Sequence, residues 1–305
     1  MIRTLAAADG RLHLATNSYS WHVFYQREGR NFADSLDAGL ADVKASAIDG
    51  YEPGIGSPDD VRRLAPLVKK HGLEMRSLYV NSTLHTDAEA RKSLENILAV
   101  GKEAQTLLGT RILVTNPNPI QWGGPQDKTD EHLRRQAYFL DQLGRALREQ
   151  DQVLAYHNHD IELRNAAREF HHMMQGTDPR HVSLCLDSHW IYRGSGNSVV
   201  ALQDAVRLYA SRIVEWHLRQ SYQGVWSETL GPGDIPHEVL AGIILKAGVR
   251  PHLVLEVAVE KGTPRTLSPV EAHRVSAGYA RATLASMAGR TPLFRSRPRR
   301  PRPLD

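Results

Sequence analysis

VLAYHNHDIE at residues 153–162 is the first of four apolar runs that decide the fold of this chain. The other three follow it in the second half of the sequence: SLCLDSHW (183–190), RIVEWHLR (212–219) and HLVLEVAVE (252–260). Each run is rich in apolar residues that do not alternate strictly with polar ones, which is typical of buried parallel strands. The pattern predicts four strands whose carboxyl ends meet at one place.

These four runs each place a potential metal ligand where the strand should end. The ligands are Glu162, Asp187, His217 and Glu256. In an α/β barrel the chemistry is built at the carboxyl ends of the strands. A single acidic residue there is commonly the N-cap of the next helix, but ligand residues at four successive strand ends favour a site for one divalent cation. Carboxylate oxygens with one imidazole suit Mn²⁺, Mg²⁺ or Co²⁺. If the first of these strands runs long, His157 takes the ligand position in place of Glu162.

The whole chain alternates strand-like and helix-like segments about eight times. The four earlier strands are expected at 12–16, 43–54, 73–80 and 110–119, with helices at 31–43, 57–72, 87–109 and 131–150. In the second of these helices, Ser57 is the expected N-cap and Pro58 the first helical residue. Strand–helix alternation predicts a parallel sheet covered by helices, and eight units favour a closed barrel. We therefore predict an α/β fold with a single (β/α)8 TIM barrel over residues 1–289. The Arg- and Pro-rich segment 290–305 is predicted to be a flexible tail.

Composition limits the classes of function. The 305 residues are 41% hydrophobic, enough for a large core, and much of the formal net charge of +4 comes from five Arg residues in 294–305. Nucleic acid is therefore an unlikely partner, and no Gly-rich phosphate loop indicates a nucleotide. The single cysteine, Cys185, fits a reducing compartment and is expected to be a small buried residue. No run has the length of a signal peptide or membrane span, so we expect a cytoplasmic protein without membrane contact. The oligomeric state stays open, a homo-oligomer included.

Further polar side chains are expected on the same face. Alternation along a strand puts His157 and His159 on one side, where they either line a solvated loop or exchange protons with a substrate. His189 and Arg219 each stand two residues after a predicted ligand, as substrate contacts or as supports for the ligands. Additional candidates for a carbohydrate pocket, each with a packing or turn role as its alternative, are Asn116, Trp122 and Glu52.

The stretches YHNHDIEL, LCLDSHWIYRG, EWHLRQS followed by LGPGDI, and LVLEVAVE resemble the sugar phosphate isomerase/epimerase family, the xylose isomerase-like barrels. The resemblance extends from SYSW to about residue 288. It implies one Mn²⁺, Mg²⁺, Co²⁺ or Zn²⁺ ion, with Mn²⁺ the first choice, held by residues from the last four strands. It transfers directly to Asp187, His217 and Glu256. Many epimerases have Glu where this chain has His157, and the HNHxxE variant resembles inosose dehydratases.

The expected activity is a metal-dependent isomerase or epimerase acting on a sugar or keto-sugar through an enediolate. Glu256 is the candidate for a carboxylate that is both ligand and base, with His157 or His159 as the second acid/base group. A lyase that dehydrates a keto-inositol or keto-sugar is the alternative, since loss of a β-hydroxyl follows the same proton abstraction. A non-catalytic sugar-binding barrel and a relative of the abasic-site endonucleases rank below these two.

Overall fold

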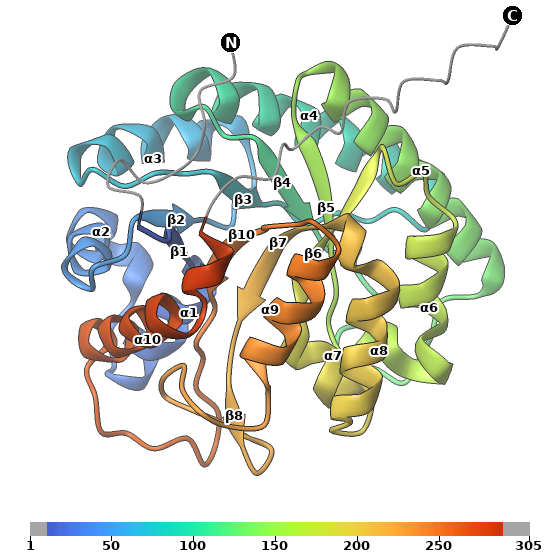
Figure 1. Ribbon diagram of the computed structural model, residues 1–305. Helices are drawn as coiled ribbons and strands as arrows, with labels where there is room; N and C mark the ends of the chain where they lie inside the picture. Colours follow the sequence, from blue (N-terminus) through green and yellow to red (C-terminus); the bar gives the residue numbers. More distant parts are fainter. Residues whose placement is uncertain (1–10, 289–305) are drawn as a thin grey trace, which may run out of the picture.

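The computed structural model describes residues 11–288, which form an eight-stranded parallel sheet arranged as a barrel (Figure 1). Neighbouring strands pair in the order β2-β1-β10-β7-β6-β5-β4-β3. At the two ends of this order the Tyr51 amide donates to the Glu74 carbonyl and the Tyr79 amide to the Pro53 carbonyl, both at 2.9 Å, so β2 lies beside β3. The prediction of a (β/α)8 TIM barrel is confirmed. The barrel strands are β1 (Leu14–Asn17), β2 (Gly50–Glu52), β3 (Ser77–Tyr79), β4 (Ile112–Thr115), β5 (Val153–His157), β6 (Val182–Asp187), β7 (Ile213–Leu218) and β10 (His252–Leu255).

Helices surround the strands as an outer ring (Figure 1). They are α1 (Ser18–Arg27), α2 (Leu36–Ala45), α3 (Pro58–Lys70), α4 (Asp87–Leu108), α5 (Asp130–Glu149), α6 (Arg164–Gln175), α7 (Ser188–Gly194), α8 (Val199–Tyr209), α9 (His237–Lys246) and α10 (Pro269–Thr283). Short 3-10 helices lie at Phe32–Ser35, Ile161–Leu163, Ala210–Arg212 and Ala285–Met287. An antiparallel hairpin of β8 (Ser221–Tyr222) and β9 (Val225–Trp226) follows β7. None of the helices within residues 11–288 is long and apolar enough to cross a membrane.

The start of α3 shows how local sequence fixes an element. The Ser57 backbone amide donates to Asp60 Oδ2 at 2.8 Å, and Pro58 occupies the first helical position, where its missing N–H costs nothing. The helix ends before Gly72, whose φ of +59° lies in the left-handed region that glycine tolerates. The predicted N-cap and first residue are confirmed.

The start of one predicted strand is wrong, and one helix was not predicted. The segment expected as one strand at 43–54 begins as the last turn of α2, and β2 starts only at Gly50. The helix α1, which the sequence reading left out, begins directly after β1 because the Asn17 side chain accepts a hydrogen bond from the Tyr19 amide at 2.7 Å. It buries Trp21, Phe24 and Tyr25, at helical spacing, in the core. The predicted tail at 290–305 lies outside the described residues.

Candidate metal centre

Four side chains meet at the carboxyl ends of β5, β6, β7 and β10. His157 is the last residue of β5, Asp187 the last of β6, His217 lies near the end of β7, and Glu256 follows β10 directly. Strand register brings them level, because Asp187 pairs with His217 and the Glu256 amide donates to the Leu218 carbonyl at 3.0 Å. One ligand atom from each of the four lies within 4.8 Å of the others.

Three possible ligand atoms of this group lack, within the described residues, the hydrogen-bond partners that buried polar atoms normally have. His157 and Asp187 are buried, yet both His157 ring nitrogens and Asp187 Oδ2 find no hydrogen-bond partner among residues 11–288. Unsatisfied buried groups are costly unless something fills the gap between them. His157 Nε2 and Asp187 Oδ2 are 3.9 Å apart, too far for a hydrogen bond. The group therefore surrounds a space with two imidazoles and two carboxylates, a set of ligands that fits a divalent transition-metal cation.

Glu162 does not join this group. Strand β5 ends at His157, and the chain then turns into the 3-10 helix Ile161–Leu163. The Glu162 carboxylate instead accepts hydrogen bonds from the His159 amide at 2.7 Å and from Asn116 Nδ2 at 3.0 Å. Burial, followed by the nearby charge of Glu169, raises the pKa of Glu162 to about 7. The structure thus brings together three of the four predicted ligands and adds His157, the alternative left open for the fifth strand.

The residue between the two histidines of the HNH motif fixes the end of β6. Asn158 Nδ2 donates to the Asp187 carbonyl at 3.1 Å, and the Asp187 amide donates to Asn158 Oδ1 at 3.2 Å. Asp187 Oδ1 also accepts from the Trp190 amide at 2.9 Å and so caps α7. The N-cap role that is common for an acidic residue after a strand is therefore taken by one oxygen of Asp187. The other oxygen stays open toward the metal group.

Arg219 supplies positive charge beside the group. Its guanidinium donates to Glu256 and lies 3.8 Å from Asp187 Oδ2. It is stacked near the rings of Trp190 and Trp226, at 5.0 and 4.5 Å from their centroids. Burial raises the pKa of Asp187 to about 6, although the positive charge of Arg219 acts to lower it. For Glu256, burial opposes ionisation but Arg219 and then His217 outweigh it and lower the pKa.

A second layer of carboxylates lies behind His217. The Nδ1 atom of His217 contacts Glu256, while its Nε2 atom lies 3.1 Å from Glu52 Oε1 and 3.2 Å from Glu215 Oε1. Glu52 also accepts from Asn17 Nδ2 at 2.6 Å and from Ser77 Oγ at 2.7 Å. Glu52 was expected in the pocket wall, but it is fully buried and is not among the residues that line the cavity.

Glu215 is a residue of this second layer that the sequence analysis did not predict. It stands two positions before His217 on β7, so strand alternation directs both side chains to the same side. The spacing of two residues between Glu215 and His217 was the sequence signal that could have identified Glu215. Burial, followed by repulsion from Glu52, raises the pKa of Glu215 to about 8. Burial also opposes the charge on Glu52, but His217 outweighs it and lowers the pKa of that carboxyl. The pair therefore divides into one neutral and one ionised carboxyl group.

A cavity of about 660 Å³ opens above the four-residue group. Five of the predicted site residues line it: His157, His159, Trp122, Arg219 and Glu256. Residues that line it without having been predicted include Asn17, Tyr19, His22, Tyr79, Asn81 and Trp190. The cavity combines aromatic rings with polar side chains, which is the usual make-up of a small-molecule site.

The remaining predicted residues lie around this cavity in different ways. His159 packs edge-on against Trp122, with ring centroids 5.1 Å apart, and burial lowers its pKa to about 4. Asn116 does not line the cavity, and its amide donates to the His157 carbonyl at 2.9 Å as well as to Glu162. His189 is fully buried beside Trp226, with ring centroids 6.1 Å apart, and likewise does not line it.

The fold and the site together define a class of protein. It is a TIM barrel with imidazole and carboxylate side chains at the carboxyl ends of its later strands. A sequence model of the xylose isomerase-like TIM barrel family matches residues 40–281, and the chain belongs to that family. The chain is also similar to the inosose dehydratase of Mesomycoplasma hyopneumoniae, at 22% identity over 281 residues that cover 82% of this chain and 89% of that protein.

Solved structures give the same fold. A sugar phosphate isomerase/epimerase from Parabacteroides distasonis superposes with a TM-score of 0.67 at 16% identity, covering 94% of this chain and 100% of the other. A D-allulose 3-epimerase from Methylomonas sp., in complex with D-allulose, has a TM-score of 0.68 at 13% identity, covering 90% and 97%. The resemblance to sugar phosphate isomerases/epimerases is confirmed.

Proposed function

We propose that the protein is a divalent-metal-dependent isomerase or epimerase that acts on a sugar or keto-sugar through an enediolate. The observation that carries this proposal is the group of His157, Asp187, His217 and Glu256, buried at the floor of a polar and aromatic cavity. Within residues 11–288, both ring nitrogens of His157 and Asp187 Oδ2 have no hydrogen-bond partner. The family and the named relatives support it. With two imidazoles in the set, Mn²⁺ and Co²⁺ fit better than Mg²⁺. When bound, the ion would polarise a substrate carbonyl and acidify the neighbouring C–H bond.

The protein's own residues divide the remaining work. Glu256, kept ionised by Arg219, is the base that removes the proton from carbon. Arg219 also holds the Glu256 carboxylate in place, because its Nε atom donates to the Glu256 carbonyl at 3.1 Å. His159 faces the same cavity and is the group that exchanges a proton on the other side of the substrate. Trp122 and Trp190, which also line the cavity, exclude water and offer faces to a sugar ring.

A dehydratase acting on a keto-inositol or keto-sugar is the second candidate. The specific observations in its favour are the similarity to the inosose dehydratase and the imidazole at the end of β5. Both activities begin with removal of a proton next to a carbonyl, so Glu256 serves either. They differ in whether the proton returns or a β-hydroxyl group leaves.

Proton NMR in D₂O separates these possibilities. Chelator-treated protein would be supplied with Mn²⁺ and incubated with a panel of ketohexoses, ketopentoses and 2-keto-inositol. An isomerase or epimerase incorporates deuterium at carbon and retains all oxygens, whereas a dehydratase gives a product that has lost water. Absence of exchange or product with every substrate, in protein that binds Mn²⁺ stoichiometrically, would reject the enzymatic proposal and leave a sugar-binding barrel.

A further inference from the structure

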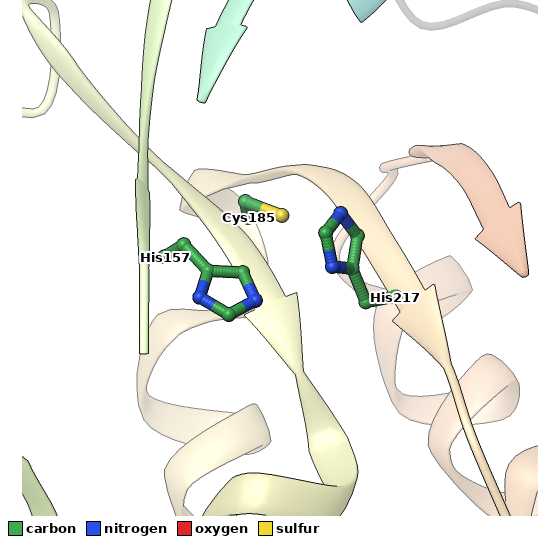
Figure 2. A group of neighbouring side chains, drawn as sticks. All are labelled: His157, Cys185 and His217. Atoms are coloured by element: carbon green, nitrogen blue, oxygen red, sulfur yellow. The ribbon is translucent and has the colours of Figure 1, made fainter. Parts of the chain in front are cut away.

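The only cysteine of the chain lies directly beneath the metal centre. Cys185 precedes Asp187 by two residues on β6, so its side chain points to the same side of the strand, one layer deeper in the barrel. It pairs in register with His157 on β5 and with Glu215 on β7. Figure 2 shows the thiol directed toward the gap between the rings of His157 and His217.

These three side chains form a compact donor set of their own. One ligand atom each from His157, Cys185 and His217 lies within 4.8 Å of the others, and the two imidazole centroids are 4.8 Å apart. The exposed fractions are 1% for His157 and 0% for the other two. Both ring nitrogens of His157 lack a partner within the described part of the chain, so an imidazole without a hydrogen bond faces a buried thiol. His157 also lines the cavity, so its ring borders both the cavity and this deeper layer.

We propose that His157, Cys185 and His217 are a second, sulfur-containing metal set, and that a thiophilic cation such as Zn²⁺ or Cd²⁺ binds there. The proposal rests on the metal centre of the proposed function, because the two sets share both histidines. A single ion therefore occupies one set or the other. Thiolate with imidazole is a preferred environment for softer cations, whereas the carboxylates of Asp187 and Glu256 favour harder cations such as Mn²⁺. The identity of the cation thus decides the depth at which it sits.

The layer beneath can accommodate the added charge. Binding breaks the S–H bond and forms a sulfur–metal bond, with no change of oxidation state. The proton that the thiol loses is released to solvent, as binding of a metal ion to a thiol requires. In the metal-free protein this thiol donates a hydrogen bond to Glu215 Oε1 at 3.5 Å. Glu52 Oε1 and Glu215 Oε1 both lie near His217, so carboxylates surround the deeper position. An ion held at the sulfur set does not contact Asp187 or Glu256 and prevents Mn²⁺ from binding there. The protein should therefore lose its Mn²⁺-dependent activity when Zn²⁺ or Cd²⁺ is added.

The presence of one cysteine makes a direct test possible, since any thiolate–metal absorption must come from Cys185. The metal-free full chain would be titrated with Cd²⁺ while thiolate-to-cadmium charge transfer is recorded in the near ultraviolet. We expect a band that saturates at one Cd²⁺ per chain and is absent in Cys185→Ser, with Cd²⁺ affinity weakened about tenfold or more. The reciprocal variant Asp187→Asn should keep the band and lose Mn²⁺. Cys185→Ala is a second variant in case Cys185→Ser fails to fold.

Displacement of bound Mn²⁺ by Cd²⁺, followed by electron paramagnetic resonance, separates failure of this inference from failure of the proposed function. Stoichiometric Cd²⁺ binding without a thiolate band would overturn the sulfur set while leaving the Mn²⁺ centre intact. Simultaneous binding of one Mn²⁺ and one Cd²⁺ would also overturn it, because the sets would then be independent. Failure of the wild-type chain to bind either ion would reject both the sulfur set and the metal centre.

Discussion

At the scale of single residues, the identity of the ligand at the end of β5 determines the chemistry of the site. His157 lies within the donor group, whereas Glu162 is held away from it by the His159 amide and Asn116. We expect His157→Gln to lose most bound metal, because an amide is a poor replacement for imidazole, and Glu162→Gln to retain it. Metal content per chain after gel filtration, measured by mass spectrometry, gives the answer. If Glu162→Gln alone lost the metal, Glu162 would be the ligand and His157 would not.

The role of His159 can be separated from metal binding. It lines the cavity next to Trp122 and has its Nδ1 atom unpartnered within residues 11–288. His159→Gln should lower kcat by roughly a hundredfold, the usual contribution of a general acid/base group, at unchanged metal content. Trp122→Phe, which alters the same wall without removing a proton carrier, is the matched control. Unchanged kcat in His159→Gln would leave the proton transfers to Glu256.

The two carboxylates behind His217 should differ in their contribution. Glu52 has a lowered pKa and stays ionised, so it can accept a strong hydrogen bond from His217 Nε2 and orient the ring. Glu215 has a pKa raised to about 8 and is already neutral near neutral pH. Glu52→Gln should weaken Mn²⁺ binding about 10- to 100-fold, the usual cost of losing such support. Glu215→Gln should leave the affinity for Mn²⁺ nearly unchanged, as measured by calorimetry. Equal losses of Mn²⁺ affinity in the two variants would contradict the different roles of Glu52 and Glu215.

At the scale of elements, strand ends and helix starts explain which site residues could be predicted. Asp187, His217 and Glu256 follow long apolar runs, so their positions could be read from the sequence. Glu162 could not be placed, because the length of β5 depends on where the turn after His157 begins, and Asp160 and Ile161 give no strong stop signal. Glu215 was hidden because a charged residue inside an apolar strand suggests exposure unless its partners are known.

Helices α1 and α10 meet through an aromatic contact that makes stability depend on pH. His273 stacks on Trp21, with centroids 4.1 Å apart, and its Nδ1 atom bonds to the Pro269 carbonyl at 2.7 Å. Burial lowers the pKa of His273 from 6.5 to about 4. Between these two values the unfolded chain binds the proton more readily, so the free energy of unfolding falls as the pH decreases through that window. Above 6.5 the group is neutral in both states and adds no pH dependence.

The predicted effect is measurable by comparing His273→Phe with the wild type. Complete titration through the window would destabilise the wild type by up to about 3 kcal/mol, since each unit of pKa shift corresponds to about 1.4 kcal/mol. Phe keeps the ring contact and removes the titration, so its loss of stability between pH 6.5 and 4 should be smaller. Other buried histidines titrate in both proteins and cancel in the difference. Parallel curves of unfolding free energy against pH would contradict this account.

At the scale of the whole molecule, the barrel was predictable because its strands are apolar and alternate with helices throughout. The sheet order then brings residues from β5, β6, β7 and β10 to one end, although they are spread over about a hundred positions of sequence from His157 to Glu256. The cavity was less predictable. Tyr19 and Asn17 come from the first strand and helix, and no local pattern connects them with Glu256. Only closure of the barrel, with β1 beside β10, places them together.

The central claim is that one divalent cation is held by His157, Asp187, His217 and Glu256. A crystal structure of the Mn²⁺-soaked protein, with anomalous diffraction recorded above and below the manganese absorption edge, tests it most directly. The account predicts a single manganese peak per chain, in contact with those four side chains and not with Glu162. A peak bound by Glu162 in place of His157, or fully loaded crystals with no peak at the carboxyl end of the barrel, would contradict it.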